Sequence, residues 1–232
     1  MNYFILGILP FITVLIFVLG MGYRLYTWFH TPQPGALTLF PAPKAGSETF
    51  FNVLKESFLF PSLFQGDKVL WGISWIFHVM LALIFVGHIR VVTDFPKLWA
   101  ALGINADKMS AVSGGAAGIL IMVLAIVLIV RRLAVPRVRQ ISNLPDYITL
   151  LLITAILVTG NAMRFGEHFD LEITRTYFSA LFTFSLSAAI IPQVGMFTLH
   201  FLLAQLLIIF IPFSKIMHFG GMFFTQTVIK KA

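Results

Sequence analysis

Five apolar runs divide the sequence, and each is long enough to cross a lipid bilayer as a helix. A helix needs about 20 residues to span roughly 30 Å of hydrocarbon. The chain is 59% hydrophobic and only 11% charged, a balance that no soluble domain of this length requires. We therefore expect an all-α integral membrane bundle that forms a single domain over residues 1–232. The five predicted transmembrane helices cover about residues 3–23, 69–92, 111–130, 146–163 and 192–214.

The ends and gaps of these runs give three further expectations. The first positive charge, Arg24, follows the first run, whereas a secretory signal carries positive charge ahead of its apolar region, so we expect this run to be a retained span. Residues 49–60 are amphipathic and too short to span, which favours a short interfacial helix. Residues 173–190 are apolar enough for a sixth span, but Pro192 and the Ser and Thr content favour a helix on the surface.

The distribution of Lys and Arg predicts the orientation of the bundle. With five spans, eleven of the 16 basic residues lie on the side of the C-terminus and five lie on the other side. The positive-inside rule then places the N-terminus outside and the C-terminus in the cytoplasm, as in the inner membrane of a prokaryote. This placement explains the net charge of +7, and no basic groove with interleaved aromatic residues indicates nucleic acid. The eleven are Arg24, Lys44, Lys55, Lys68, Arg131, Arg132, Arg137, Arg139, Lys215, Lys230 and Lys231, and the five are Arg90, Lys97, Lys108, Arg164 and Arg175.

Four of the six histidines lie in or beside two of the apolar runs. A neutral imidazole in lipid still needs partners for its donor and its acceptor, so its presence there requires a reason. His78 and His88 are separated by about 80° around a helix, and the spacing of His200 and His218 equals about five whole turns, which predicts one shared face. Because the second and fifth spans run antiparallel in this topology, we expect His78 to face His218 towards the cytoplasm. His88 then faces His200 towards the outside.

Each facing pair can hold one iron from both sides of a porphyrin, so the pattern predicts two haem b groups. The chain has no cysteine, which excludes covalently attached c-type haem and cysteine-ligated iron–sulfur clusters. Along the helix axis, His78 and His88 are about 15 Å apart, whereas His200 and His218 are about 27 Å apart. Helix tilt, a kink at Pro212 or tilted haems must absorb this difference. His30 and His168 are expected to be interfacial polar residues. Two alternatives remain open: a transporter whose histidines relay protons, and a structural anchor without haem.

Three stretches of the sequence resemble the gamma subunit family of respiratory nitrate reductase, over about residues 68–220. They are IFHVMLALIFVGH, SGGAAGILIMVLAIVLIVRRLAVPRVR and TLHFLLAQLLIIFIPFSKIMH. The resemblance implies a di-haem cytochrome b, in which His78 and His218 ligate the haem nearer the cytoplasmic partner. It implies that His88 and His200 ligate the distal haem, and that quinol is oxidised beside this haem, where a glycine of the family matches Gly87.

The sequence also departs from this family. The family's Arg-Leu-His reads Thr198-Leu199-His200 here, so a haem-propionate partner is missing, and Lys108 is the nearest basic residue in a shortened loop where the family has a quinol-site lysine. The stretch PSLFQGDKVLWGISWIFH looks more like the cytochrome subunits of sulfite-reductase-associated complexes, sulfate-reducer transmembrane complexes and heterodisulfide reductases.

We therefore expect a membrane subunit that passes electrons between menaquinone or ubiquinone near the outer face and an iron–sulfur subunit on the cytoplasmic side. The complex, with further subunits, would serve a nitrate or sulfur-compound reductase, and the sequence allows electron flow in either direction. The basic loop that follows the third span is expected either to set topology or to dock an acidic partner surface. The predicted quinone site comprises Gly87, His88, Arg90 and Lys108, with Asp94 as proton acceptor, and the basic loop contains Arg131, Arg132, Arg137 and Arg139.

Overall fold

The computed structural model describes residues 2–32, 46–166, 170–218, 220–221 and 223, and these residues form helices without any strand. Five helices are long and apolar enough to cross a membrane, which confirms the predicted number of spans. The long helices are α1 (Leu9–His30), α4 (Lys68–His88), α7 (Gly115–Ala134), α9 (Leu144–Phe165) and α11 (Gly195–Phe210). With the short turns at their ends, the spans are Phe4–His30, Lys68–Val91, Ala106–Ala134, Leu144–Phe165 and Gly195–Phe213.

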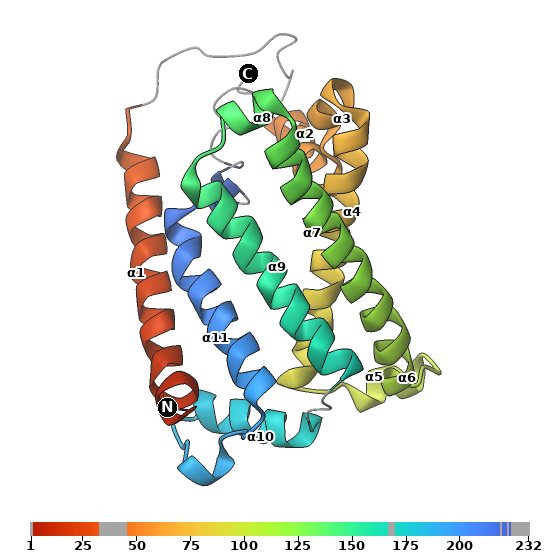
Figure 1. Cartoon of the computed structure of the whole chain (residues 1–232), viewed down its shortest axis with the longest axis vertical. Helices are drawn as coiled ribbons and strands as arrows, with labels where there is room; N and C mark the ends of the chain where they lie inside the picture. Colours follow the sequence, from red (N-terminus) through yellow and green to blue (C-terminus); the bar gives the residue numbers. More distant parts are fainter. Residues whose placement is uncertain (1, 33–45, 167–169, 219, 222, 224–232) are drawn as a thin grey trace.

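The five long helices alternate in direction, so that α4 and α11 run antiparallel as expected (Figure 1). Helix α9 packs against both α7 and α11, while α4 packs against α7 and α1 packs against α11. Short helices gather at the two ends of the bundle. The α8 end carries α2 (Gly46–Leu59), α3 (Pro61–Gly66) and α8 (Pro136–Gln140), and the α10 end carries α5 (Pro96–Ala101), α6 (Ala106–Met109) and α10 (Leu171–Phe182).

The segment that could have been a sixth span is a short surface helix. Helix α10 has only 12 residues and lies across the ends of the spanning helices (Figure 1). The Asp170 side chain caps its start by accepting hydrogen bonds from the backbone N–H groups of Glu172 and Ile173. The chain turns away after Phe182, and Phe184 adopts a left-handed conformation with φ of 56°. The preference for a surface helix is therefore confirmed.

The expected amphipathic helix near residues 49–60 is α2, at the α8 end of the bundle. Its last carbonyl groups lack partners within the helix, as at every helix end. Two indoles from the start of α4 supply them: Trp71 Nε1 donates to Leu59 O at 2.7 Å, and Trp75 Nε1 donates to Phe58 O at 3.0 Å. These bonds fix α2 to the spanning helix that carries His78.

The boundaries of three spans differ from the expected ones. The first helix continues to His30, beyond the apolar run, because nothing in residues 24–30 breaks it. The third span begins at Ala106, where the Asn105 side chain caps the helix by accepting a hydrogen bond from Lys108 N at 2.9 Å. The fifth begins at Gly195 and not at residue 192, because the preceding Val194 is extended. Capping and local conformation set these ends, and hydropathy does not report them.

Two apolar clusters hold the spanning helices together. One lies between α4, α7 and α9 and consists of buried Phe77, Ile121, Ala125 and Leu157. The other joins α10 to the turn before α1, to the end of α9, and to the start of α11 and the segment before it, and it consists of Leu6, Met163, Tyr177, Leu181, Ile191 and Phe197. In the second cluster the Tyr177 ring is fully buried. The bundle is thus closed at the α10 end by side chains of the surface helix.

Candidate metal centres

The structure brings together the two histidine pairs that the sequence predicts. The imidazole centroids of His78 and His218 are 5.9 Å apart, with the ring planes at 86°. Those of His88 and His200 are 6.3 Å apart, with the planes only 9° from parallel. Each pair joins α4 to α11 or to the segment just after it.

In three of these imidazoles, Nδ1 is bonded to a backbone carbonyl. The partners are Ser74 O for His78 at 2.6 Å, Ile84 O for His88 at 2.7 Å and Lys215 O for His218 at 3.0 Å. A carbonyl oxygen only accepts, so Nδ1 carries the proton and the neutral ring keeps its lone pair on Nε2. This is the arrangement found in metal-ligating histidines, whose second nitrogen donates to a carbonyl.

In the fourth imidazole, His200, the partner is a side chain. The ring Nδ1 lies 2.9 Å from the Thr159 hydroxyl oxygen, which belongs to α9. Thr159 also lies 3.0 Å from the carbonyl oxygens of Ala155 and Ile156, so its own proton has an acceptor in the preceding turn. The hydroxyl then accepts from His200 Nδ1, and Nε2 is again left with its lone pair.

The spacing of the rings fits an iron held by two axial imidazoles. Two metal–nitrogen bonds of about 2 Å each, together with the two ring radii, separate opposed ring centres by roughly 6 Å. No group of three or more His, Cys, Asp or Glu side chains converges within the described ranges. A bare zinc ion needs about four protein ligands, whereas a porphyrin supplies four nitrogens and needs only two more. A pair of opposed histidines therefore suits haem and does not suit a bare ion.

His218 reaches His78 by a different route from the one expected. Helix α11 ends at Phe210, two short 3-10 turns follow, and Ser214 between them is extended with ψ of 172°. The prediction that His200 and His218 share one face of a continuous helix is therefore wrong. Pro212 has no N–H and its ring does not fit a helix interior, so the helix breaks there. Three explanations were open for the longer axial rise from His200 to His218 than from His78 to His88. The structure shows one of them, the break at Pro212.

Two polar contacts hold the segment after this break. Arg24 Nε donates to Pro212 O at 2.7 Å. The buried carboxylate of Asp146, with 5% of its side chain exposed, accepts from Lys215 Nζ at 2.8 Å and lies 3.3 Å from Arg132. Because Lys215 O is the acceptor for His218 Nδ1, these contacts fix the position of that imidazole.

Arg90, one of the expected quinone-site residues, is held in a network at the α10 end. It donates to Asp94 at 3.1 Å, to Asp107 at 2.8 Å and to Ala106 O at 3.0 Å, and only 11% of its side chain is exposed. Arg175 of α10 donates to the same Asp94 carboxylate at 2.8 Å. The Arg90 guanidinium, with Trp99, holds the pKa of Asp94 well below its usual range, so this carboxylate is a weak proton acceptor.

The remaining expected quinone-site residues are accessible. Gly87 is exposed, and a Cβ built there would meet nothing within 4 Å. His88 is also exposed. Lys108 lies beside Asp107 and lines a shallow hollow with Asn105, Met109, Val112 and Ser113. The structure thus places Gly87 and His88 at one end of α4, and Lys108 follows Ala106 and Asp107, the two residues before it that Arg90 contacts.

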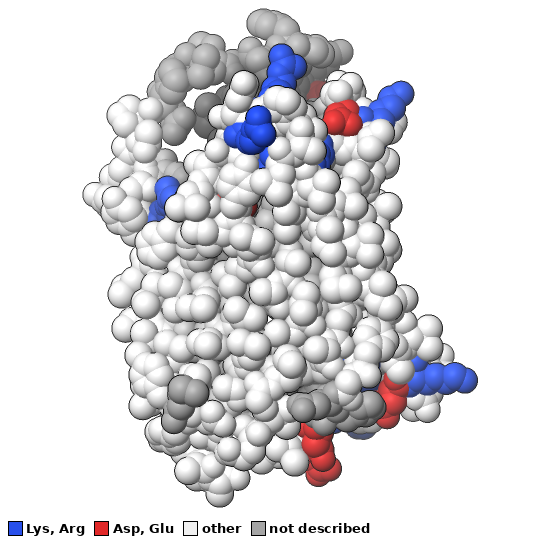
Figure 2. Space-filling model, viewed as in Figure 1, with Lys and Arg blue, Asp and Glu red and all other residues white. Residues whose placement is uncertain are grey.

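The basic loop after the third span divides into two halves. Arg131 is paired with Asp67 at 3.4 Å, and Arg132 donates to Ser142 at 2.8 Å as well as lying near Asp146. Arg137 and Arg139 of α8 are exposed. Figure 2 shows basic side chains gathered at this end of the molecule. Of the other histidines, His30 is exposed at the end of α1, and His168 lies outside the described residues.

The sequence model of the nitrate reductase gamma subunit family matches residues 61–228. The chain belongs to this family. It is 32% identical to an Hdr-like menaquinol oxidoreductase cytochrome b-like subunit of Archaeoglobus fulgidus, over 95% of this chain and 77% of the relative. A subunit of the same name from Archaeoglobus profundus is 28% identical, over 94% and 76%. The nitrate reductase gamma chain of Bacillus subtilis is 27% identical, over 91% and 88%.

Membership of the gamma subunit family confirms the resemblance seen in the sequence, and with the five spans it identifies a multi-pass membrane protein. Sequence reasoning missed three side chains that position the histidines: Thr159, Asp146 and Lys215. A signal existed for Asp146, because an ionisable residue at the edge of a span requires a partner. None existed for Thr159, since threonine is common in membrane helices and its contact with His200 joins two different spans.

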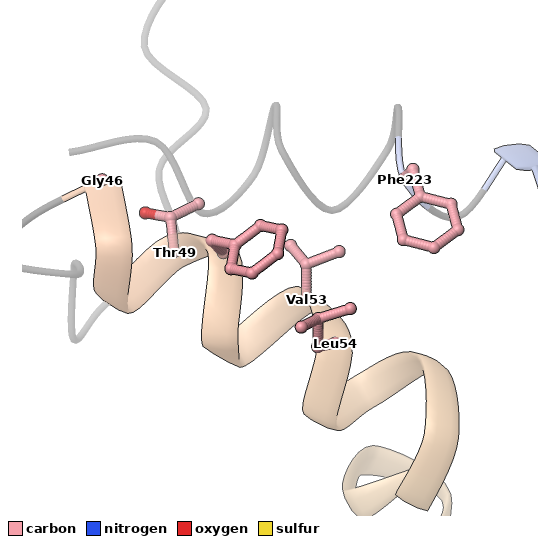
Figure 3. Close-up of a pocket in the computed structure, with 6 residues that line it drawn as sticks. Gly46, Thr49, Val53, Leu54 and Phe223 are labelled. Carbon is pink, nitrogen blue, oxygen red and sulfur yellow. The ribbon is translucent and has the colours of Figure 1, made fainter.

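An apolar hollow lies beside α2 in this member of the gamma subunit family. Figure 3 shows the α2 side chains that line it together with Phe223. The lining comprises Gly46, Thr49, Phe50, Val53, Leu54 and Phe223. None of these side chains is a metal ligand or a titratable group, so the hollow offers no chemistry of its own.

Proposed function

We propose that this chain is a di-haem b subunit that carries electrons between a membrane quinone and an iron–sulfur subunit. The observation that carries the proposal is the pair of histidine sites, each with two Nε2 lone pairs available and ring centres about 6 Å apart. The relatives named as cytochrome b-like subunits of a menaquinol oxidoreductase support it. The menaquinol of that name favours menaquinone as substrate over ubiquinone.

His78 and His218 would hold one haem near the α8 end, and His88 and His200 would hold the other near the α10 end. Each haem, when bound, accepts and releases one electron. The protein contributes the ligands and their orientation, and backbone carbonyls or Thr159 fix the protonated nitrogen of each ring. The apolar cluster of Phe77, Ile121, Ala125 and Leu157 keeps water from the middle of the bundle.

We place the quinone site at the α10 end, beside His88. Gly87 carries no side chain and has open space beside it, so a flat ring can approach the helix backbone there. Lys108 is exposed and can meet a quinol oxygen, whereas Arg90 is committed to Asp94 and Asp107 and holds the loop in place. The network around Arg90 therefore serves as the support of this site.

We place the iron–sulfur partner at the α8 end, on the cytoplasmic side. The chain has no cysteine and cannot hold cysteine-ligated clusters, so electrons leaving the haem near His218 must pass to another subunit. The N-terminus would lie outside and the complex would lie in the inner membrane of a prokaryote, serving a nitrate or sulfur-compound reductase.

The test is the haem content of the chain purified from membranes of a haem-replete host. We expect the reduced-minus-oxidised spectrum of low-spin haem b, two haems per chain, and reduction of both by a menaquinol analogue. A chain that purifies folded without haem would overturn the proposal and leave a proton-relaying transporter or a structural anchor. One haem per chain would overturn the two-site assignment.

A further inference from the structure

His200 differs from the other three histidines of the two pairs because its Nδ1 meets a side-chain hydroxyl, that of Thr159, beside the backbone carbonyl of Ile156. A backbone carbonyl cannot be removed by substitution, but the Thr159 hydroxyl can. We propose that Thr159 and Gly160 of α9 are positioning residues that fix the tautomer and the ring plane of His200. This inference rests on the proposed function, because it assigns to these residues the orientation of one haem ligand.

The hydrogen-bond geometry of Thr159 assigns the direction of its bond to His200. Thr159 is buried, with 6% exposed, so its hydroxyl has no water to satisfy it. The single hydroxyl proton points to the carbonyl of Ala155 or Ile156, each 3.0 Å away. The lone pairs that remain accept from His200 Nδ1 at 2.9 Å. The bond thus keeps the proton on Nδ1 and leaves Nε2 for a metal.

Gly160, the next residue of α9, allows the same ring to lie close to the helix backbone. A Cβ built on Gly160 would lie 3.3 Å from His200 Cε1. The ring therefore rests against the α9 backbone, and a side chain at this position would push it. The Thr159 bond to Nδ1 and the close approach of Gly160 to Cε1 both act on the α9 side of the ring, so a change at either residue should turn or shift the imidazole. In the structure this plane lies within 9° of that of His88.

The orientation of the two planes has a spectroscopic consequence. When two axial imidazoles are parallel, their π-donation separates the two π-type d orbitals of ferric iron, and when they are perpendicular this effect cancels. Parallel planes therefore give a low-spin ferric signal with moderate g anisotropy, and perpendicular planes give one with a large maximum g value. With a haem held between each pair, the angles of 9° and 86° would give two distinguishable signals. Thr159 and Gly160 act only on the signal from the site of His88 and His200.

The experiment compares three variants of the full chain in haem-replete membranes. Thr159→Val removes the hydroxyl and keeps the shape, and Thr159→Ser keeps the hydroxyl. Thr154→Val is the matched control, because Thr154 is on the same helix and its hydroxyl bonds Leu150 O at 2.7 Å instead of a histidine. The measurements are haem content, electron paramagnetic resonance of the oxidised haems and a potentiometric titration of each haem.

We expect Thr159→Val to change the parallel-plane signal alone and to raise the potential of that haem. An imidazole without its Nδ1 acceptor is a weaker donor and stabilises ferric iron less. A roughly tenfold loss of preference for the ferric state corresponds to about 59 mV for a one-electron couple. Thr159→Ser and Thr154→Val should match the native protein in both measurements.

Unchanged signals and potentials in Thr159→Val would overturn the inference and leave the proposed function intact, because both haems would still be present. Absence of haem from the native chain would instead overturn the proposed function. If Thr159→Val does not accumulate, Gly160→Ala tests the inference instead. This variant keeps the hydroxyl and displaces the ring, so the parallel-plane signal should shift, and an unchanged signal would overturn the inference.

Discussion

At the scale of single residues, a bond from Nδ1 to a carbonyl does not by itself mark a metal ligand. The exposed His30 makes the same bond, to Tyr26 O at 2.8 Å. What distinguishes His78 is the second imidazole that faces it at 5.9 Å. His30 is therefore the matched control for any test of ligation.

His78→Ala should remove the haem at the α8 end and leave the other one, because His88 and His200 form a separate site. We expect one haem per chain, measured by pyridine haemochrome against protein concentration. His30→Ala should retain two. A His78→Ala chain that still carries two haems would show that the ligand assignment is wrong.

Gly87→Leu should block the quinone while leaving both haems in place. A Cβ at this position would meet nothing within 4 Å, so the added side chain starts in open space beside the backbone and the fold should be retained. We expect dithionite to reduce both haems and a quinol to reduce neither. Gly72→Leu is the control, because Gly72 is on the same helix and also has open space beside it. Normal quinol-dependent reduction in Gly87→Leu would exclude this end of α4 as the quinone site.

The sequence alone predicted the four paired histidines and could not predict what holds them. The order of the spans is sufficient to bring His78 and His218 to the same end of the bundle, because the number of spans makes the second and the fifth antiparallel. The contact of Thr159 with His200 depends on α9 packing against α11 and on one side-chain rotamer. Such a contact leaves no periodic pattern in the sequence. The same holds for Arg90, whose position suggested a quinone contact and whose partners are Asp94 and Asp107.

At the scale of the helix, Pro10 determines which hydrogen-bond donors the first carbonyl groups of the first span find. A turn of π-helix, Phe4–Ile8, precedes α1, and Leu9 N bonds to Phe4 O. Pro10 has no N–H, so the carbonyls four and five residues before it lose their helical donors. Side chains from other elements supply them: Tyr177 OH donates to Leu6 O at 2.6 Å, and Gln205 Nε2 donates to Ile5 O at 3.0 Å.

Tyr177→Phe should therefore destabilise the bundle by about 1–3 kcal/mol, the cost of a buried carbonyl without a donor. Adding Pro10→Ala restores an N–H to Leu6 O and should recover part of the loss. The measurement is the free energy of unfolding in a mixed-micelle denaturation series, with Tyr23→Phe as control because Tyr23 is 66% exposed. Equal losses in Tyr177→Phe and in the double variant would contradict this account of Pro10.

At the scale of the whole molecule, hydropathy was sufficient for the number of spans, and Pro192 with the Ser and Thr content of residues 173–190 was sufficient to favour a surface helix there. They failed where tertiary contacts replace helical ones. The path to His218 leaves the helix at Pro212, and the broken segment is stable because Arg24 bonds to Pro212 O and Asp146 pairs with Lys215. Pro212 indicated in the sequence that the helix could break, but these partners come from two other spans, so no local pattern could show the path of the chain after the break. The sequence nevertheless predicted that His78 faces His218. The antiparallel direction of the two spans was right, and the five regular turns between His200 and His218 were wrong.

The α8 end is where the molecule should meet its partner, and its two exposed arginines make that testable. Arg131 and Arg132 are already paired with Asp67 and Asp146, whereas Arg137 and Arg139 are exposed on α8. If they steer an acidic partner surface, replacing both with glutamine should weaken association at low salt. The native and variant complexes should converge at high salt, because charges are then screened within a few ångströms. Replacing both with lysine keeps the charge and is the matched control. The measurement is the fraction of partner subunit that co-purifies across a salt series, and equal fractions at every salt concentration would leave these arginines only the role of setting topology.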